Sequence, residues 1–352
     1  MRLLAVLVLV GACARSESTA APTPAQAEKP PRARSSTPAD EPDLTTTLAE
    51  FGGKPVEKIE TQWPDGKKKR IAWVIRQPGG RTVDHGPDWR WYPNGQLELK
   101  RTWKQGRQDG PFESWFEGGF QAARGAFVED ERDGPWLTWH ETGEPRTEQT
   151  WKRGQLEQRA REWYDDGSPL SESWWKAGLQ DGPSVTWDLE GHPLVQGAYA
   201  DGKKHGEWRE WTPDHREKMR GFYAGGREVG TWTKLDNQNR RIEETYVDGR
   251  LEGPSRTFSP DGVLLQEANY VAGKAHGLQR SWWPSGKLLS EIEYDAGVQH
   301  GRSRYYFESG VIQIEGDMVR GQKQGMWTYR KEDGSIDPQW SGRYENDQRV
   351  GS

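Results

Sequence analysis

Residues 134–143 read GPWLTWHETG and hold two tryptophans, two glycines and a proline in ten positions. Glycine weakens the interior of helices and strands, so this density needs a reason other than local propensity. The same pattern recurs 24 residues away on both sides, where Trp115 and Trp163 correspond to Trp139. Fixed periods of this length are typical of repeat proteins, in which each unit packs mainly on its neighbours.

Each unit can be aligned on one residue, usually glycine, which we call the anchor. The spacing is 24 residues, apart from a one-residue deletion before the eighth unit, and an aromatic residue stands five places after the anchor in most units. A turn such as YPNG or SPDG follows and ends in glycine in nine of eleven units, with His215 and Asn239 as the exceptions. Both residue types tolerate positive φ better than most. The anchors are Gly86, Gly110, Gly134, Gln158, Gly182, Gly206, Gly230, Gly253, Gly277, Gly301 and Gly325, with a last copy at Gly351.

Two turns in each unit leave two stretches of about five to eight residues, which is the length of a strand. These stretches carry no helical periodicity. The sequence therefore predicts an all-β protein, an elongated solenoid or meander of about 11–12 consecutive antiparallel β-hairpins with a 24-residue period over residues 51–352. An imperfect unit at 62–81 is expected to cap the array, because terminal repeats are atypical.

The composition agrees with a thin repeat protein and excludes a nucleic-acid binder. Apolar residues make up 32% of the 352 residues, which is low for a globular core, whereas Trp occurs 20 times. Aromatic side chains are therefore expected to supply most of the buried area. The 49 basic and 54 acidic residues nearly balance, so the chain has no basic footprint for nucleic acid.

The N-terminus has the pattern of an export signal. Arg2 precedes an apolar run, and the run ends in VGAC with Cys13, the one cysteine in the chain. This ending resembles the lipobox of bacterial lipoproteins, which implies a signal peptide at 1–12, a lipid on Cys13 and attachment to the membrane. The alternatives are an ordinary export signal with a chance cysteine or a buried N-terminal strand. Residues 13–50, rich in Pro, Ala and Ser, are expected to form a disordered linker. Ala14 favours the outer membrane of a bacterial cell envelope.

Two stretches carry a resemblance to a known family. YADGKKHGEWREW (199–211) and YVAGKAHGLQRSWWPSGKLLSEIEYDAGVQHG (270–301) resemble MORN repeats, and more closely the bacterial MORN-repeat variant labelled YwqK-like antitoxin. The resemblance implies a hairpin solenoid used as an interaction or membrane-associated scaffold. This chain departs from the pattern by placing Trp at many Tyr positions and Asp-Gly-Pro at many His-Gly steps. An antitoxin role does not fit an exported lipoprotein, so it is kept only as a further alternative.

No motif in the sequence indicates catalysis, a cofactor or a metal. Four histidines stand directly before anchors, but units about 10 Å apart are too widely spaced for zinc bonds near 2.1 Å. The Asp residues of the many Asp-Gly pairs are expected to serve turns. We therefore expect a protein that is not an enzyme. The four histidines are His85, His205, His276 and His300.

The tryptophans are the candidate interaction surface. The columns two and five places after the anchor should point to opposite faces of a single sheet, so at least one column is expected to be exposed. The expected partner is another envelope protein; the alternative is a cell-wall glycan that stacks on Trp. The candidate residues are Trp91, Trp115, Trp136, Trp139, Trp163, Trp187, Trp208, Trp211, Trp232, Trp282 and Trp327.

Overall fold

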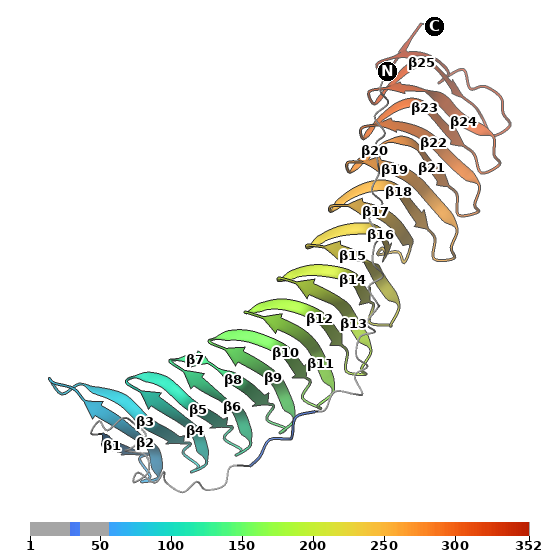
Figure 1. The fold of residues 1–352 in the computed structure, drawn as a ribbon. Helices are drawn as coiled ribbons and strands as arrows, with labels where there is room; N and C mark the ends of the chain where they lie inside the picture. The colour runs from blue at the N-terminus through green and yellow to red at the C-terminus, as the bar shows by residue number, and fades with distance from the viewer. Residues whose placement is uncertain (1–28, 36–55, 352) are drawn as a thin grey trace, which may run out of the picture.

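The protein is one long, open, twisted β-sheet (Figure 1). The structure is a computed structural model that describes residues 29–35 and 56–351. Over the described residues every strand pairing is antiparallel, and all but two strands from β1 (Glu57–Gln62) onward pair with the next strand of the chain, as far as β27 (Gln348–Val350). The predicted all-β meander of hairpins is therefore confirmed. The predicted signal peptide at 1–12 and Cys13 lie outside the described residues.

The strands are short and regularly spaced. Those of the first half are β2 (Lys68–Arg76), β3 (Thr82–Trp91), β4 (Leu97–Lys104), β5 (Arg107–Trp115), β6 (Gln121–Val128), β7 (Glu131–Arg132), β8 (Gly134–Trp139), β9 (Pro145–Lys152), β10 (Gln155–Trp163), β11 (Pro169–Lys176), β12 (Leu179–Trp187) and β13 (Pro193–Ala200). Those of the second half are β14 (Lys203–Trp211), β15 (Glu217–Ala224), β16 (Arg227–Leu235), β17 (Arg241–Val247), β18 (Arg250–Phe258), β19 (Leu264–Val271), β20 (Lys274–Ala275), β21 (Gly277–Trp282), β22 (Leu288–Asp295), β23 (Val298–Tyr306), β24 (Ile312–Val319), β25 (Gln322–Tyr329) and β26 (Gly342–Glu345). Two of these, β7 and β20, are short pieces separated from the strand that follows.

The anchor residue is a bulge inside the first strand of each hairpin. Gly110 has φ of 119° and Gly182 has φ of 124°, both in the left-handed region that favours glycine. The register of the neighbouring strand shifts at this point, for example between Arg101 and Trp103. Gln158 adopts the same conformation with φ of 62° and is the one anchor from Gly86 to Gly325 that is not glycine.

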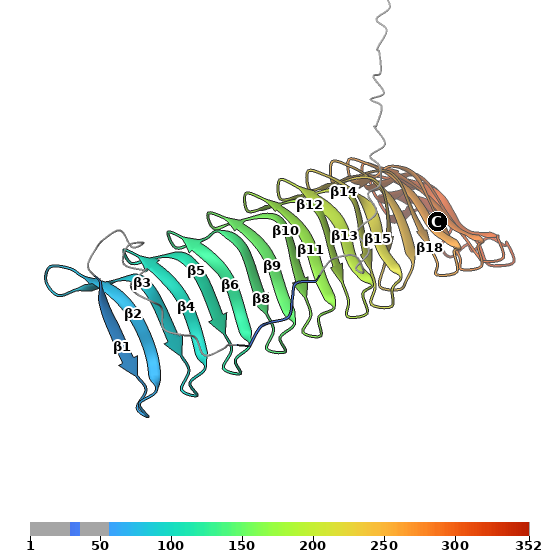
Figure 2. The ribbon, with the colours of Figure 1, turned by 60° about the horizontal axis from the view of Figure 1, so that its bottom comes forward.

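Two-residue turns form one long edge of the sheet, which we call the short-turn edge (Figure 2). In a typical turn both central residues have positive φ, as with Asp201 at 48° and Gly202 at 75°. This geometry matches the twist of antiparallel strands. The amide of Gly202 donates to the carbonyl of Gln180 in the preceding unit at 2.8 Å, and Gly226 donates to Lys204 at 2.9 Å. Successive turns are therefore hydrogen-bonded to one another along the edge.

Longer turns form the opposite edge, which we call the long-turn edge. In the turn 164–168 the amide of Gly167 donates to the carbonyl of Tyr164 at 2.9 Å, and the amide of Tyr164 donates to Ser168 at 2.9 Å. The hydroxyl of Tyr164 donates to the carbonyl of Trp187 in the next unit at 2.9 Å. Side chains at this edge thus join one turn to the next.

The tryptophan columns form the core, so the expectation that at least one of them is exposed is wrong. Nine of the eleven candidate tryptophans are at most 9% exposed. Trp211 and Trp282 are partly buried. The nine are Trp91, Trp115, Trp136, Trp139, Trp163, Trp187, Trp208, Trp232 and Trp327.

Long charged side chains supply the covering layer that the prediction left out. The Lys204 ammonium lies 4.0 Å from the Trp208 ring centroid, and the Arg132 guanidinium lies 4.3 Å from that of Trp136. Lys and Arg cover apolar surface with their methylene stems while the charged group stays near water. A single-layer sheet can therefore bury aromatics on both faces.

Glycines on the neighbouring strand let four of these rings lie flat on the backbone. A Cβ atom at Gly221 would stand 2.0 Å from the ring of Trp232, and one at Gly197 would stand 1.9 Å from the ring of Trp208. Gly125 and Gly316 receive Trp136 and Trp327 in the same way. In each pair the glycine precedes the tryptophan by eleven residues.

A candidate peptide-binding edge

The long-turn edge is the most strongly charged regular feature of the array. After a first turn at 63–67 it has eleven turns from residue 92 onward, and these eleven contain thirteen carboxylates against four Lys or Arg side chains, with at least one carboxylate in nine of them. An edge of this sign attracts segments rich in Lys and Arg. The turns are 92–96, 116–120, 140–144, 164–168, 188–192, 212–216, 236–240, 259–263, 283–287, 307–311 and 331–335.

The turn 140–144 is held firmly by its own unit and by the next. The amide of Gly143 donates to the carbonyl of His140 at 2.9 Å. The imidazole Nε2 of His140 lies 2.9 Å from the carbonyl oxygen of Trp163, and the hydroxyl of Thr142 donates to the carbonyl of Asp165 at 2.9 Å. These contacts fix the direction of Glu144, which is 8% exposed at the end of the turn.

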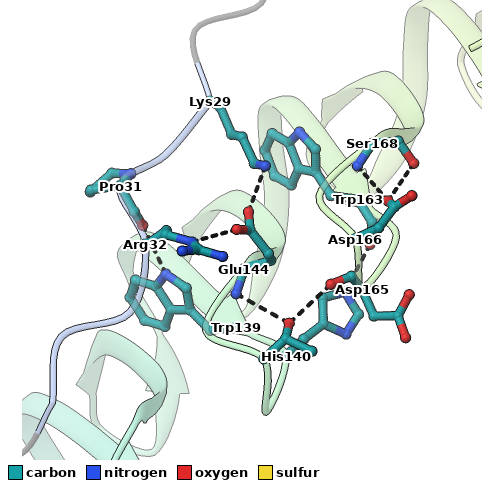
Figure 3. Close-up of polar contacts among 11 residues, drawn as sticks. Lys29, Pro31, Arg32, Trp139, His140, Glu144, Trp163, Asp165, Asp166 and Ser168 are labelled. Carbon is teal, nitrogen blue, oxygen red and sulfur yellow. Dashed lines mark hydrogen bonds and ion pairs between the residues drawn. The ribbon is translucent and has the colours of Figure 1, made fainter.

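A basic segment of the same chain lies against this turn (Figure 3). Residues 29–35 read KPPRARS, with three positive charges and no acidic residue. They run along the long-turn edge beside 116–120 and 140–144. This segment belongs to the region expected to be a linker, and no sequence signal pointed to its contact with the sheet.

Backbone hydrogen bonds hold the segment in an extended form. The amide of Ala33 donates to the carbonyl of Gly143 at 2.8 Å, and the amide of Gln121 donates to the carbonyl of Arg34 at 3.1 Å. Ser35 forms an antiparallel bridge with Phe120. Main-chain groups make these bonds, so the bonds do not depend on which side chains the segment carries.

Trp139 is the one candidate tryptophan that hydrogen-bonds to the segment. Its indole Nε1 donates to the carbonyl of Pro31 at 3.0 Å (Figure 3). The ring remains 4% exposed, so it contributes both to the core and to the edge. A buried indole N–H usually needs such a partner.

Glu144 provides the charged part of the contact. Its carboxylate pairs with the Lys29 ammonium at 2.5 Å and also with the Arg32 guanidinium. The hydrogen bond from Lys29, together with Arg32, holds the pKa of Glu144 below its ordinary value even though burial acts in the opposite direction. The pairing is therefore complete when Glu144 is ionised and is lost as the pH falls through this lowered pKa.

Neighbouring turns present related groups. The Asp166 carboxylate accepts hydrogen bonds from the amide and the hydroxyl of Ser168 at 2.7 and 2.6 Å, and these bonds hold its pKa below the ordinary value. Asp214 and Asp333 also have lowered pKa values, first because of hydrogen bonds from Thr212 and Ser335 respectively. These carboxylates therefore keep their negative charge over the neutral pH range.

Comparison with known proteins supports the repeat type. The family model described as MORN repeat variant matches residues 251–272, 275–296 and 299–319. These segments span β18–β19, the hairpin of β21 and β22, and β23–β24. The units before them have the same hairpin, anchor bulge and turns. Comparison with curated proteins gives no match.

Solved structures give only weak similarities. A chain of the crystal structure of TcdB2-TccC3 is 11% identical, with 81% of this chain and 18% of that chain covered and a TM-score of 0.16. A chain of the TcdB2-TccC3-Cdc42 structure is 11% identical, with 83% and 20% covered and a TM-score of 0.14. A chain of the Photorhabdus luminescens Tc holotoxin pore is 12% identical, with 80% and 15% covered and a TM-score of 0.13. This chain thus spans about a fifth of the length of these chains or less.

Within residues 29–35 and 56–351, no helix has the length and apolar character needed to cross a bilayer.

Proposed function

We propose that the protein is a lipid-anchored scaffold of the bacterial cell envelope that binds an extended, basic segment of another envelope protein at its long-turn edge, without catalysis. The observation that carries this proposal is the docking of residues 29–35 on the turn 140–144. It supplies an example, within one chain, of the kind of ligand that the edge accepts. The MORN-type units support a scaffold role in general.

The electrostatics of the edge support a basic partner. Glu117, Asp165 and Asp261 lie in separate turns along the edge, so a partner with spaced Lys or Arg residues can meet several carboxylates at once. Each exposed ion pair contributes only about 0–1 kcal/mol. Affinity would therefore come from the number of units engaged and from main-chain hydrogen bonds.

Residues 29–35 would then compete with the partner for the turns that they cover. In the proposed arrangement the lipid on Cys13 holds the protein at the membrane and the docked segment occupies only the first part of the edge. Later turns remain available. This predicts that partner binding spreads toward the covered turns when the segment is released.

Site-specific photocrosslinking in intact cells tests the binding edge. A photocrosslinkable amino acid placed at Glu117, Asp165 or Asp261 should capture an envelope protein. The same amino acid at Arg153, Asp201 or Asp248, on the short-turn edge, is the matched control and should capture none. Equal capture at both edges, or capture only at the short-turn edge, would refute the proposal.

A second variant tests competition by the docked segment. Lys29→Ser combined with Arg32→Ser removes both partners of Glu144. Crosslinking at Glu117 and Asp165 should then rise relative to crosslinking at Asp261. Unchanged ratios would show that the segment does not compete.

The anchor is tested separately. The Cys13→Ser variant should leave the membrane fraction and appear in the soluble envelope fraction, since stable attachment requires the acyl chains. A variant that still sediments with membranes in high salt would exclude lipidation as the anchor.

Glycan binding through stacked tryptophans is the second candidate function, and fewer tryptophans are accessible for it than the sequence predicted. Nine of the eleven tryptophans proposed for it are buried, which leaves Trp211 and Trp282 as partly accessible rings. The test is whether the purified chain binds peptidoglycan. Binding that is abolished by Trp211→Ala and Trp282→Ala would favour a glycan ligand over a protein partner. No observation favours the antitoxin alternative.

A further inference from the structure

Three side chains with metal-binding groups meet at the middle of the long-turn edge. Asp188, His192 and His215 each offer one ligand atom, and these atoms lie within 4.8 Å of one another. Asp188 and His192 belong to the turn between β12 and β13, and His215 belongs to the turn between β14 and β15. The repeat places these two turns side by side.

The distances between the groups are close to those that zinc requires. His192 Nδ1 lies 3.6 Å from Asp188 Oδ1, and His215 Nδ1 lies 3.5 Å from Asp188 Oδ2. Ligand atoms around a tetrahedral zinc with bonds of about 2.1 Å are about 3.4 Å apart. Glu190 stands in reach of both rings, with its Oε2 at 3.6 Å from His192 Nδ1 and 3.6 Å from His215 Nε2.

The two rings can adjust to a common ion. Their centroids are 3.9 Å apart and their planes are tilted by 37°. The side chains are 47% and 38% exposed. Imidazole is a preferred ligand of zinc and of related divalent transition metals.

Asp188 is already oriented for such a role. Its Oδ1 accepts hydrogen bonds from the amides of Glu190 and His192, both at 2.9 Å. Its other oxygen, Oδ2, lies 3.5 Å from His215 Nδ1.

Asp188 and His215 depart from what most units have at the same places. The position of Asp188 is aromatic in six other turns, at Tyr92, Phe116, His140, Tyr164, Trp283 and Phe307. The position of His215 is glycine in nine of the eleven turns, and His215 adopts the left-handed conformation there with φ of 63°. A side chain in this conformation costs free energy relative to glycine, although histidine tolerates it better than most residues do.

We propose that Asp188, His192 and His215 form a site for one divalent zinc ion that joins two successive turns, with water as the fourth ligand. The ligands come from two units that are 24 residues apart in the repeat. For this reason the sequence contains no recognisable metal-ligand spacing at this site. The single ion would crosslink two units at the long-turn edge, and the turn 164–168 separates it from the turn 140–144 that holds residues 29–35.

Zinc binding to the chelator-treated full chain tests the site. Titration calorimetry and metal analysis should give one zinc ion per chain. His215→Gly restores the residue that most turns carry, and His192→Gln places the residue that Gln96 provides in the first unit, so both variants should fold. Loss of an outer-shell partner alone typically weakens metal binding about 10–100-fold, so loss of either ligand should cost about 10-fold or more.

The matched control is His276→Gln, which removes an exposed histidine that lies 3.4 Å from Asp295 in another unit. It should bind zinc like the parent chain, and all variants retain Cys13. Zinc should also raise the unfolding temperature of the parent chain and leave that of His215→Gly unchanged. Absence of stoichiometric binding, or equal binding by parent, His192→Gln and His215→Gly, would overturn the proposal.

Discussion

Asp88 shows how much one residue can depart from the pattern of its column. It stands two places after the anchor, where other units have Trp, Phe, Ala, Ser or Gln, and it is fully buried. Arg70 Nε donates to Oδ1 at 2.7 Å, and Arg101 Nε donates to Oδ2 at 2.9 Å. The indole of Trp103 donates to the same oxygen at 3.2 Å. A buried charge is stable only with such partners.

The buried carboxylate makes the first unit sensitive to acid. Burial acts to raise the pKa of Asp88, but the hydrogen bonds and charges of Arg70 and Arg101 outweigh it and the pKa is lowered from 3.8. The stabilisation is therefore complete above pH 3.8 and is lost as the pH falls through the lowered pKa. Asp88→Ala should destabilise the first unit by about 1–3 kcal/mol, because the partly buried Arg70 and Arg101 lose a shared partner, although Arg70 keeps its ion pair with Asp84.

Hydrogen exchange of β2 and β3 against pH measures this effect. Asp317→Asn is the matched control, since Asp317 is 55% exposed and pairs with Arg302 at 3.7 Å on the surface. Its effect should stay within about 1 kcal/mol. Equal loss of protection in the two variants would contradict a special role for Asp88.

At the scale of the strand, the glycine and tryptophan of neighbouring strands act as one packing unit. The ring of Trp232 covers Gly221, and Tyr223 and Tyr246 approach it edge-on with centroids at 4.9 and 6.4 Å. The Lys234 ammonium lies 5.6 Å from the Trp232 ring centroid and donates to the Tyr246 hydroxyl at 3.0 Å. Backbone, ring and ammonium therefore form successive layers within a single sheet.

A double-mutant cycle tests this packing. Gly221→Ala should destabilise the chain by about 1–3 kcal/mol, since the new Cβ would overlap the ring of Trp232. In the Trp232→Ser background, which copies Ser255 and Ser303 of other units, the same change should cost far less. Chemical denaturation gives the four free energies of unfolding. Additive effects would mean that the glycine serves some purpose other than receiving the ring.

The strands could be predicted from the sequence, whereas the burial of the tryptophans could not. Turn geometry is a local property, so the glycines at 24-residue spacing were sufficient to predict the hairpins. They also predicted the positive φ angles of His215 and Asn239, which stand at glycine positions. Burial depends on which side chains of neighbouring units reach over a ring, as Lys204 does over Trp208. The docking of residues 29–35 was missed for a similar reason, because composition describes a segment without its surroundings.

At the scale of the whole molecule, two rows of contacts hold the array together. Turn-to-turn amide bonds run along the short-turn edge, as from Gly249 to Glu228 at 2.9 Å. Side-chain bonds such as that from Tyr92 to Trp115 at 3.0 Å run along the long-turn edge. Both rows join each unit only to the next, so stability is nearly a sum of unit and interface terms. The docked segment contacts two successive turns, and the proposed zinc ion would join two others.

This arrangement predicts that a whole unit can be removed but half a unit cannot. Deletion of residues 206–229 joins His205 to Gly230 and keeps the period. In the shortened chain Trp232 stands eleven residues after Gly197, the glycine that receives the Trp208 ring in the parent chain. Likewise, the amide of Gly249 meets the carbonyl of Lys204, which accepts from Gly226 in the parent chain. The shortened full chain should fold, and its maximum dimension in small-angle scattering should fall by about 10 Å, the width of two strands.

Deletion of residues 206–217 is the matched control, since it removes half a period. This deletion would make β15 follow β13 after a two-residue turn. The two strands run in the same direction in the parent chain, whereas a two-residue turn can join only antiparallel strands. The sheet should break at this point, and the units on either side should lose protection from proteolysis. A folded, cooperative half-unit deletion, or an unfolded whole-unit deletion, would contradict assembly by nearest-neighbour contacts. The comparison is sharp because the larger deletion is expected to be the milder one.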